Sequence, residues 1–158
     1  YLPKSNPKNI NIDNNSIDFY YSRSVFEHIP SKDLIDIISE GRRLLKPNGL
    51  FISKIDLSDH FANKNNLLSQ INFLKYSKAT WNFLSKNNFS YANRLRISDF
   101  KEYFESLNMS LLNEDNVVSQ KIVKQLQESK FKVHKDFWKY DLTELATTSS
   151  WLIFKKKI

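Results

Sequence analysis

The sequence contains no cysteine and only two glycines, Gly41 and Gly49. Without cysteine the chain has no disulfide bond, no cysteine-ligated zinc or iron–sulfur site and no thiol nucleophile. A glycine-rich phosphate-binding loop needs several glycines, because its tight turns bring the backbone close to the ligand. Such a loop is therefore excluded from these 158 residues.

Long apolar runs are also missing, since no segment approaches the roughly 18 residues of a membrane span. The first eight residues, YLPKSNPK, lack the apolar core of a signal peptide. We therefore expect a soluble, cytoplasmic protein that has no membrane partner.

The residues that are present can build a core, because 41% are hydrophobic and 14% aromatic. This length and composition predict a single domain over residues 1–158. The net charge is +7, but residues 119–158 hold nine lysines against four acidic residues and so carry most of it. The basic character is therefore local, and a polyanion-binding surface over the whole chain is not indicated.

The first third of the chain shows the pattern of a βαβ unit. An apolar, aromatic run at 17–22 predicts a buried strand, and residues 50–55 predict a second. Between them, apolar residues at helical spacing predict one buried helix face: Leu34, Ile37, Ile38, Gly41, Leu44 and Leu45. Pro47, Asn48 and Gly49 end this helix, since proline cannot continue it and the other two tolerate left-handed backbone angles.

The remaining chain alternates between polar stretches and short apolar segments. Residues 57–97 form an asparagine-rich insertion around one helical stretch. Further helices are expected at 98–107 and 119–128, and further strands at 109–112 and 150–154.

Two motifs resemble those of a known enzyme family. They are IDFYYSRSVFEHIP at 17–30 and RRLLKPNGLFI at 42–52. With the helix between them, they resemble the second half of a class I S-adenosylmethionine-dependent methyltransferase of the broad type 11 group. The resemblance is close over about residues 9–56 and covers 98–158 only by the order of elements. Asn48 replaces the glycine that is usual in the family, and it tolerates the same backbone angles.

This resemblance implies an α/β fold with a partial Rossmann-like sheet. The family's strand order is 3-2-1-4-5-7-6, so residues 17–22, 50–55, 109–112 and 150–154 would be strands 4, 5, 6 and 7. The helical insertion after strand 5 would cap the acceptor site. Strands 1 to 3, with the glycine-rich cofactor loop, would precede Tyr1. We therefore expect these residues alone to be inactive, and the exposed edge of strand 4 to permit self-association.

The end of the first strand is the expected cofactor contact. The resemblance implies that this segment lines the methionine and methyl end of S-adenosylmethionine. Its residues are Ser22, Arg23, Ser24 and Val25. Alternatively, Ser24 and Val25 are ordinary residues of a strand-to-helix turn.

His28 is the candidate for catalysis. Methyl transfer from a sulfonium is an in-line displacement, in which a base helps if the acceptor is a hydroxyl. An imidazole that titrates near neutrality suits that role. The alternative is a histidine whose ring nitrogens bind the backbone and fix the turn before Pro30. Glu27 is interpreted as a solvated charge or a charge at a helix N-terminus, rather than as half of an acid/base pair.

Substrate contacts are expected after strand 50–55, from Lys54, Asp59 and His60. One histidine with flanking carboxylates does not make a metal-ligand set, so the sequence predicts no metal site. Further substrate contacts are expected from Tyr91, Arg94 and Arg96, near the end of the insertion.

Two arginines spaced by two on an extended segment point the same way, which suits a carboxylate, phosphate or sugar acid. Alternatively, Arg94 and Arg96 form salt bridges with Asp99 or Glu102.

The sequence thus predicts methyl transfer from S-adenosylmethionine to a small, polar, carbohydrate-related acceptor. The alternative is a non-catalytic basic module that binds nucleic acid or an acidic partner through lysines and interleaved aromatic residues. Those aromatic residues are Phe131, Phe137, Trp138 and Tyr140. The βαβ signature favours the enzyme, so we expect a small-molecule acceptor and no nucleic-acid partner.

Overall fold

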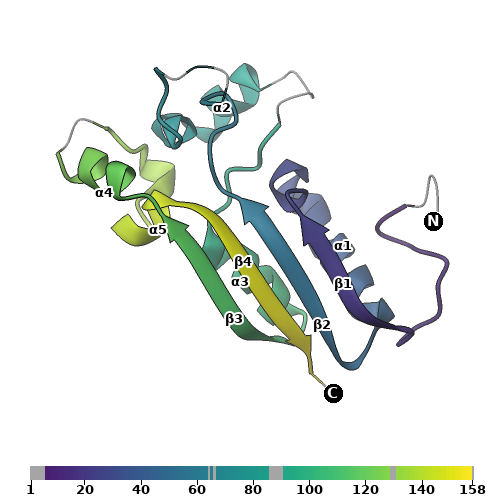
Figure 1. Ribbon diagram of the computed structural model, residues 1–158. Helices are drawn as coiled ribbons and strands as arrows, with labels where there is room; N and C mark the ends of the chain where they lie inside the picture. Colours follow the sequence, from purple (N-terminus) through teal and green to yellow (C-terminus); the bar gives the residue numbers. More distant parts are fainter. Residues whose placement is uncertain (1–5, 64, 66, 86–90, 129–130, 158) are drawn as a thin grey trace.

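The computed structural model describes residues 6–63, 65, 67–85, 91–128 and 131–157. Its centre is a four-stranded mixed sheet in the order β1-β2-β4-β3 (Figure 1). The strands are β1 (Ile17–Arg23), β2 (Leu45–Asp56), β3 (Met109–Val118) and β4 (Thr147–Lys156). β1 and β2 are parallel, whereas β4 runs antiparallel to both β2 and β3. This is the 4-5-7-6 part of the predicted strand order, and the expected α/β fold is confirmed.

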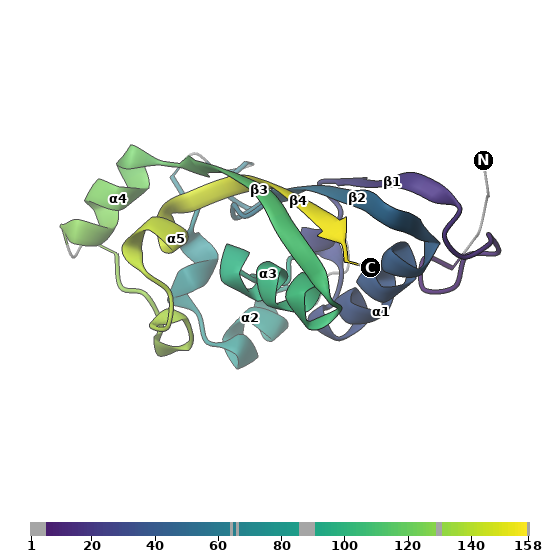
Figure 2. The same ribbon diagram turned by 90° about the horizontal axis from the view of Figure 1, so that it is seen from below.

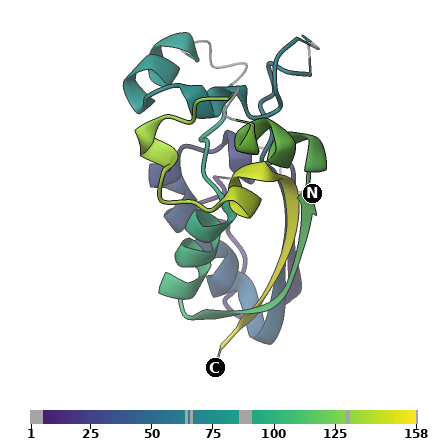
Figure 3. The same ribbon diagram turned by 90° about the vertical axis from the view of Figure 1, so that its left-hand side faces the viewer.

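Helix α1 (Ser31–Leu44) connects the two parallel strands. All six residues of its predicted apolar face are buried. α1 and α3 (Ile97–Ser106) lie on the same side of the sheet, as Figures 2 and 3 show. The main core fills the space between these helices and the sheet, and its members include Phe26, Phe51 and Phe104.

Strand β2 begins five residues earlier than predicted. Leu45 already pairs with Ile17, and the register then shifts before Phe19 pairs with Leu50. Asn48 takes a left-handed φ of 64°, as expected from its place in the motif. The segment that was predicted to be a separating turn is therefore an irregularity within the strand.

Strands β3 and β4 are both longer than the predicted 109–112 and 150–154. They pair with each other from Met109 and Lys156 to Val118 and Thr147. The second half of β3 is polar, which obscured it in the sequence. A strand at the edge of a sheet tolerates such residues, because one of its faces meets solvent.

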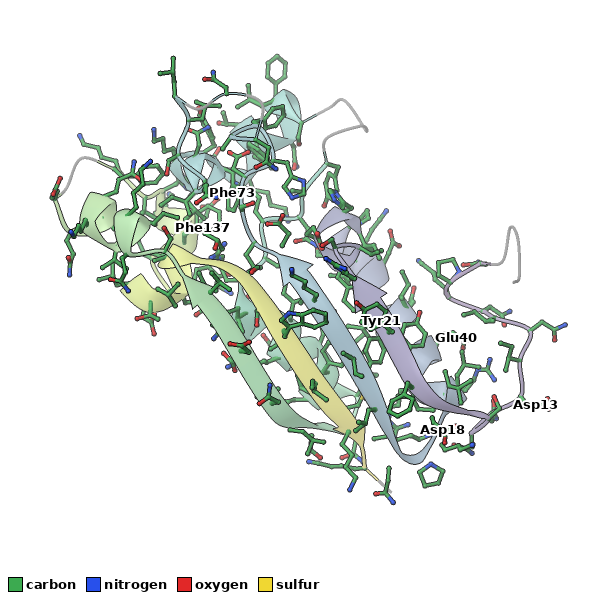
Figure 4. The ribbon with its side chains drawn as sticks, viewed as in Figure 1. Asp13, Asp18, Tyr21, Glu40, Phe73 and Phe137 are labelled. Atoms are coloured by element: carbon green, nitrogen blue, oxygen red, sulfur yellow. The ribbon has the colours of Figure 1, made fainter. Side chains whose placement is uncertain are left out.

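The insertion packs at the end of the sheet where β1 and β2 finish (Figure 1). It contains a short 3₁₀ turn, η2 (Asn72–Lys75), and helix α2 (Lys78–Leu84). The carboxyl-terminal part contributes α4 (Gln120–Gln127), η4 (Lys135–Phe137) and α5 (Leu142–Ala146). A second apolar cluster unites these segments, and Figure 4 shows two of its members, Phe73 and Phe137, at this end of the molecule.

The edge strand β1 leaves aromatic side chains in contact with solvent. Phe19 is 62% and Tyr21 57% exposed, and Figure 4 shows Tyr21 beside the strand. The exposed edge agrees with the expected position of this strand, while self-association through it stays a prediction. Among the described helices, none combines the length and the apolar character that crossing a bilayer requires.

Glu40 of α1 ties the amino-terminal segment to the helix. Its carboxylate accepts hydrogen bonds from Arg43 Nε and Nη2, each at 2.7 Å, and from the Ile10 backbone N–H at 2.6 Å. The hydrogen bonds from Arg43 hold the pKa of Glu40 below its ordinary value. A lowered pKa in the folded state adds stability above the unfolded-state pKa of about 4.3, and this stability is lost as the pH falls.

We therefore expect Glu40→Gln to lower the urea midpoint of unfolding at pH 7. The difference from the unmodified protein should shrink as the pH is lowered from 5 toward 3, because protonation removes the same charge. Urea titrations at several pH values measure this. Glu105→Gln, on an exposed position of α3, is the matched control. A Glu40→Gln difference that does not change with pH would contradict the role given to the carboxylate.

Candidate functional site

Four ionisable side chains gather at the carboxyl ends of the parallel strands. Glu27 and His28 come from η1 (Phe26–His28), a 3₁₀ turn after β1, and Asp56 and His60 come from the end of β2 and the loop that follows. The rings of His28 and His60 are 4.8 Å apart between centroids. We call these four residues the histidine cluster. In open α/β sheets, ligands bind at the carboxyl ends of the parallel strands.

A tight turn after β1 brings η1 to this place. Ser24 has a left-handed φ of 52°, and its N–H donates to the Lys54 carbonyl at 2.9 Å. The strand therefore ends in a bend that is anchored to β2. Phe26 then enters the core at 2% exposure, which fixes the position of the two residues that follow it.

The hydrogen bonding of His28 defines its tautomer. Nδ1 lies 2.9 Å from the Tyr91 backbone carbonyl. A carbonyl oxygen can only accept, so Nδ1 carries a hydrogen and Nε2 of the neutral ring has a free lone pair. The sequence left open that both ring nitrogens of His28 bind the backbone. Only Nδ1 makes such a contact among the described residues. The ring is exposed, and Nε2 is available as a proton acceptor or a ligand.

His60 is held by Asp56. Its Nε2 lies 3.4 Å from Asp56 Oδ2, and the hydrogen bond to this carboxylate raises the pKa of His60. The other carboxylate oxygen, Oδ1, accepts from the backbone N–H and the hydroxyl of Ser58, at 2.9 and 2.7 Å. The imidazole orientation is therefore set by a carboxylate that is itself fixed.

Glu27 is not a solvated charge; it lies in the first turn of η1, which agrees with the other interpretation, a charge at a helix N-terminus. It is only 4% exposed, and within the described part of the chain neither carboxylate oxygen accepts a hydrogen bond from another residue. Burial raises the pKa of this carboxyl group. An unpaired buried carboxylate is costly, so its presence at the cluster needs an explanation.

The predicted cofactor contacts lie where strand β1 ends. Ser22 is buried, and its hydroxyl is without a partner among the described residues. Arg23, Ser24 and Val25 are exposed. A buried hydroxyl without a partner, next to three exposed residues at this end of the sheet, fits the polar methionine end of S-adenosylmethionine.

The predicted substrate contacts separate into different surroundings. Lys54 Nζ lies 5.7 Å from the ring centroid of Trp151 on β4. Asp59 is 1% exposed, and its Oδ1 accepts from the Phe61 N–H at 2.9 Å. Asp59 therefore stabilises the backbone of its own loop, and its side chain is buried away from the surface. Of these three predicted contacts, His60 is the one that belongs to the histidine cluster.

The prediction that Arg94 and Arg96 point the same way is wrong. Arg94 has a φ of 60°, which breaks the alternation of an extended segment. Arg96 is completely buried, and its guanidinium donates to the carbonyls of Leu57, Glu144 and Thr147. Arg96 therefore cannot contact an acceptor. Among the described residues, neither arginine forms the alternative salt bridge with Asp99 or Glu102. The Asp99 carboxylate instead accepts from the Arg96 backbone N–H, from Lys139 and from the Tyr140 hydroxyl.

Arg94 lies in a groove of about 250 Å³ beside the cluster. Its Nη1 donates to the Tyr76 carbonyl at 2.7 Å, and its guanidinium lies over the rings of Trp81 and Phe137. Burial lowers the pKa of Arg94 to about 10. Tyr91, whose carbonyl binds His28, also lines the groove, so groove and cluster are adjacent.

The aromatic residues proposed for a basic binding module do not form a stacking surface. Phe131 and Phe137 are each 4% exposed and belong to the second apolar cluster, whereas Trp138 is 75% exposed. Stacking of bases requires exposed rings. The structure therefore gives this alternative little support.

Comparison with known proteins gives one family match and a set of solved structures with a similar fold. Residues 4–53 match the family described as "Methyltransferase domain", and no curated protein matches the chain. A SAM-dependent methyltransferase from Methanosarcina mazei superposes with a TM-score of 0.61 at 11% identity, over 98% of this chain and 66% of that one. A Bacillus halodurans structure described as a methyltransferase gives 0.58 at 14% identity, over 98% and 70%.

A third structure carries ligands. It is phosphoethanolamine N-methyltransferase 2 of Haemonchus contortus, in complex with phosphomonomethylethanolamine and S-adenosylhomocysteine. It superposes with a TM-score of 0.52 at 15% identity, over 97% of this chain and 36% of that chain. At such identities the likeness concerns the fold. The chain thus spans about a third to about two thirds of the length of these relatives.

Proposed function

We propose that this chain is part of a class I S-adenosylmethionine-dependent methyltransferase that transfers a methyl group to a small polar acceptor at the histidine cluster. The sheet order and the domain match over residues 4–53 support the enzyme class. The observation that carries the proposal is the fixed tautomer of His28. Its Nδ1–H donates to the Tyr91 carbonyl. Nε2 therefore stays available at the carboxyl ends of the two parallel strands.

When bound, S-adenosylmethionine supplies the methyl group on a positively charged sulfur. His28 Nε2 accepts the proton that the acceptor loses as its oxygen or nitrogen forms the new bond to carbon. A well-placed base contributes about 10²–10⁴-fold to such a step. The Tyr91 carbonyl stabilises the resulting imidazolium, because it already accepts the Nδ1 hydrogen.

Ser22, Arg23, Ser24 and Val25 hold the methyl end of the cofactor in this proposal. The glycine-rich loop that binds the rest of the cofactor in this family is absent from these residues. We therefore expect the described chain alone to be inactive, and the activity is to be sought in the complete gene product. We also propose that the reaction takes place in the cytoplasm.

The acceptor binds in the groove beside the cluster, under the insertion at 57–97. Tyr91, Asn93 and Arg94 line it with polar groups, and the buried ring of Trp81 lies behind Arg94. Such a mixture suits a carbohydrate-related or similarly polar molecule. The complex of the Haemonchus contortus enzyme with phosphomonomethylethanolamine supports a small polar acceptor.

Substitution of His28 tests the proposal. In the complete gene product, His28→Gln should lower kcat for methyl transfer by at least about 10²-fold, because glutamine cannot accept the proton. The KM for S-adenosylmethionine should change little. Transfer of a radiolabelled methyl group to a panel of small hydroxyl and amine acceptors measures both constants.

His134→Gln is the matched control, since His134 caps η4 and takes no part in the cluster. It should retain the activity of the unmodified protein. Equal rates for the His28 and His134 variants would overturn the role of His28 as a base.

A further inference from the structure

We propose that Glu27, His28 and His60 form a site for one divalent transition-metal ion. Each of the three side chains offers a ligand atom, and these atoms all lie within 4.8 Å of one another. Two ligands that bind the same ion at about 2.1 Å are roughly 3–4 Å apart. Small side-chain rotations are therefore enough to close the set around an ion.

The unpaired carboxylate of Glu27 is the independent observation that points to a cation as its ligand. Its exposed fraction is 4%, and no residue of the described chain donates to either oxygen. Buried carboxylates are normally paired with a positive group or with a metal. A bound cation would supply the partner that the described residues do not provide.

The histidines have the supporting contacts that metal-binding histidines have. In such residues, one ring nitrogen binds the metal while the other donates to a carbonyl or carboxylate. His28 Nδ1 donates to the Tyr91 carbonyl at 2.9 Å, and His60 Nε2 lies 3.4 Å from the Asp56 carboxylate. His28 Nε2 and His60 Nδ1 are thus left for the ion.

The ligand chemistry selects the type of ion. Two imidazoles and one carboxylate suit zinc and the neighbouring first-row metals, whereas magnesium and calcium prefer sets made of oxygen alone. Three protein ligands leave at least one coordination position for water or another small ligand.

Metal binding has a consequence for catalysis that rests on the proposed function. The ion and the transferred proton compete for the same lone pair on His28 Nε2. An occupied site therefore inhibits methyl transfer, and the cluster makes the reaction sensitive to zinc.

Calorimetry with Zn²⁺ tests the site directly. The metal-free complete gene product, with any affinity tag removed, should bind one Zn²⁺ with a Kd in the micromolar range or below. Glu27→Gln and His60→Gln should each weaken binding by at least about 10-fold. His134→Gln should bind as the unmodified protein does. Circular dichroism confirms that each variant is folded.

Two results would overturn the metal site. One is the absence of saturable heat, and the other is unchanged Zn²⁺ affinity in both the Glu27 and the His60 variants. Because these measurements need no enzymatic activity, they separate the two proposals. Zinc binding without methyl transfer in any assay leaves the metal site standing and removes the proposed function. Transfer that depends on His28 without zinc binding does the reverse.

Discussion

Replacing Arg96 by methionine should lower the free energy of unfolding by at least about 3 kcal/mol. Arg96 precedes α3 and is fully enclosed. Its guanidinium joins three segments, since it donates to the Leu57 carbonyl at 2.9 Å, to the Glu144 carbonyl at 2.7 Å and to the Thr147 carbonyl. Methionine fills most of the volume and donates nothing.

The size of the effect follows from what remains after the substitution. Each buried carbonyl that loses its donor costs about 1–3 kcal/mol. The Leu57, Leu145 and Thr147 carbonyls are affected, whereas the Glu144 carbonyl keeps the Thr147 backbone N–H as a donor. Arg96 itself is a costly residue to bury, and burial lowers its pKa to about 10. Relief of that cost offsets part of the loss. We therefore expect a value near the lower end of the summed range.

Two variants make the test specific. Arg96→Lys keeps the charge but replaces the planar fork by a single ammonium group, so it should lie between methionine and arginine. Arg23→Met, at an exposed position on β1, should change the free energy by no more than about 0.5 kcal/mol. Urea unfolding followed by tryptophan fluorescence measures all three. An Arg96→Met loss no larger than that of Arg23→Met would show that the buried guanidinium does not hold the three segments together.

The sequence predicted the βαβ unit well because its signals are local. The apolar spacing of α1 and the left-handed tolerance of Asn48 depend on residues a few positions apart, and both predictions are confirmed. The length of β3 was missed because its second half is polar. That half becomes a strand only by pairing with β4, whose partner residues lie 29 to 40 positions further along the chain.

The candidate site was predicted in part. His28 and His60 were identified separately, since each follows a predicted strand. Their contact, and the burial of Glu27 near them, depend on how two loops meet in space. Nothing local in the sequence distinguishes a buried Glu27 from a solvated one. The prediction for Arg96 failed in the opposite direction. Its type and spacing predicted an exposed substrate contact, whereas the fold buries its guanidinium among backbone carbonyls.

Phe104→Ala should lower the free energy of unfolding by about 3–5 kcal/mol. Phe104, on α3, is completely buried. Its ring stacks on Phe154 of β4 at 4.1 Å between centroids and meets Phe51 of β2 edge-on at 4.8 Å. The substitution removes the aromatic group that joins α3 to the two central strands, and the stiff sheet cannot move inward to fill the space.

Graded variants identify the cause of this loss. Phe104→Leu leaves a smaller cavity and should cost about 1–2 kcal/mol. Phe19→Ala removes the same side chain from a position that is 62% exposed, and should cost under about 1 kcal/mol. The ring centroid of Phe104 also lies 6.5 Å from that of Phe26 in η1, so removal of the Phe104 ring should loosen the turn that carries His28. Hydrogen exchange of the η1 amides should therefore be faster in Phe104→Ala than in Phe19→Ala, and equal rates would show that the core does not position the histidine cluster.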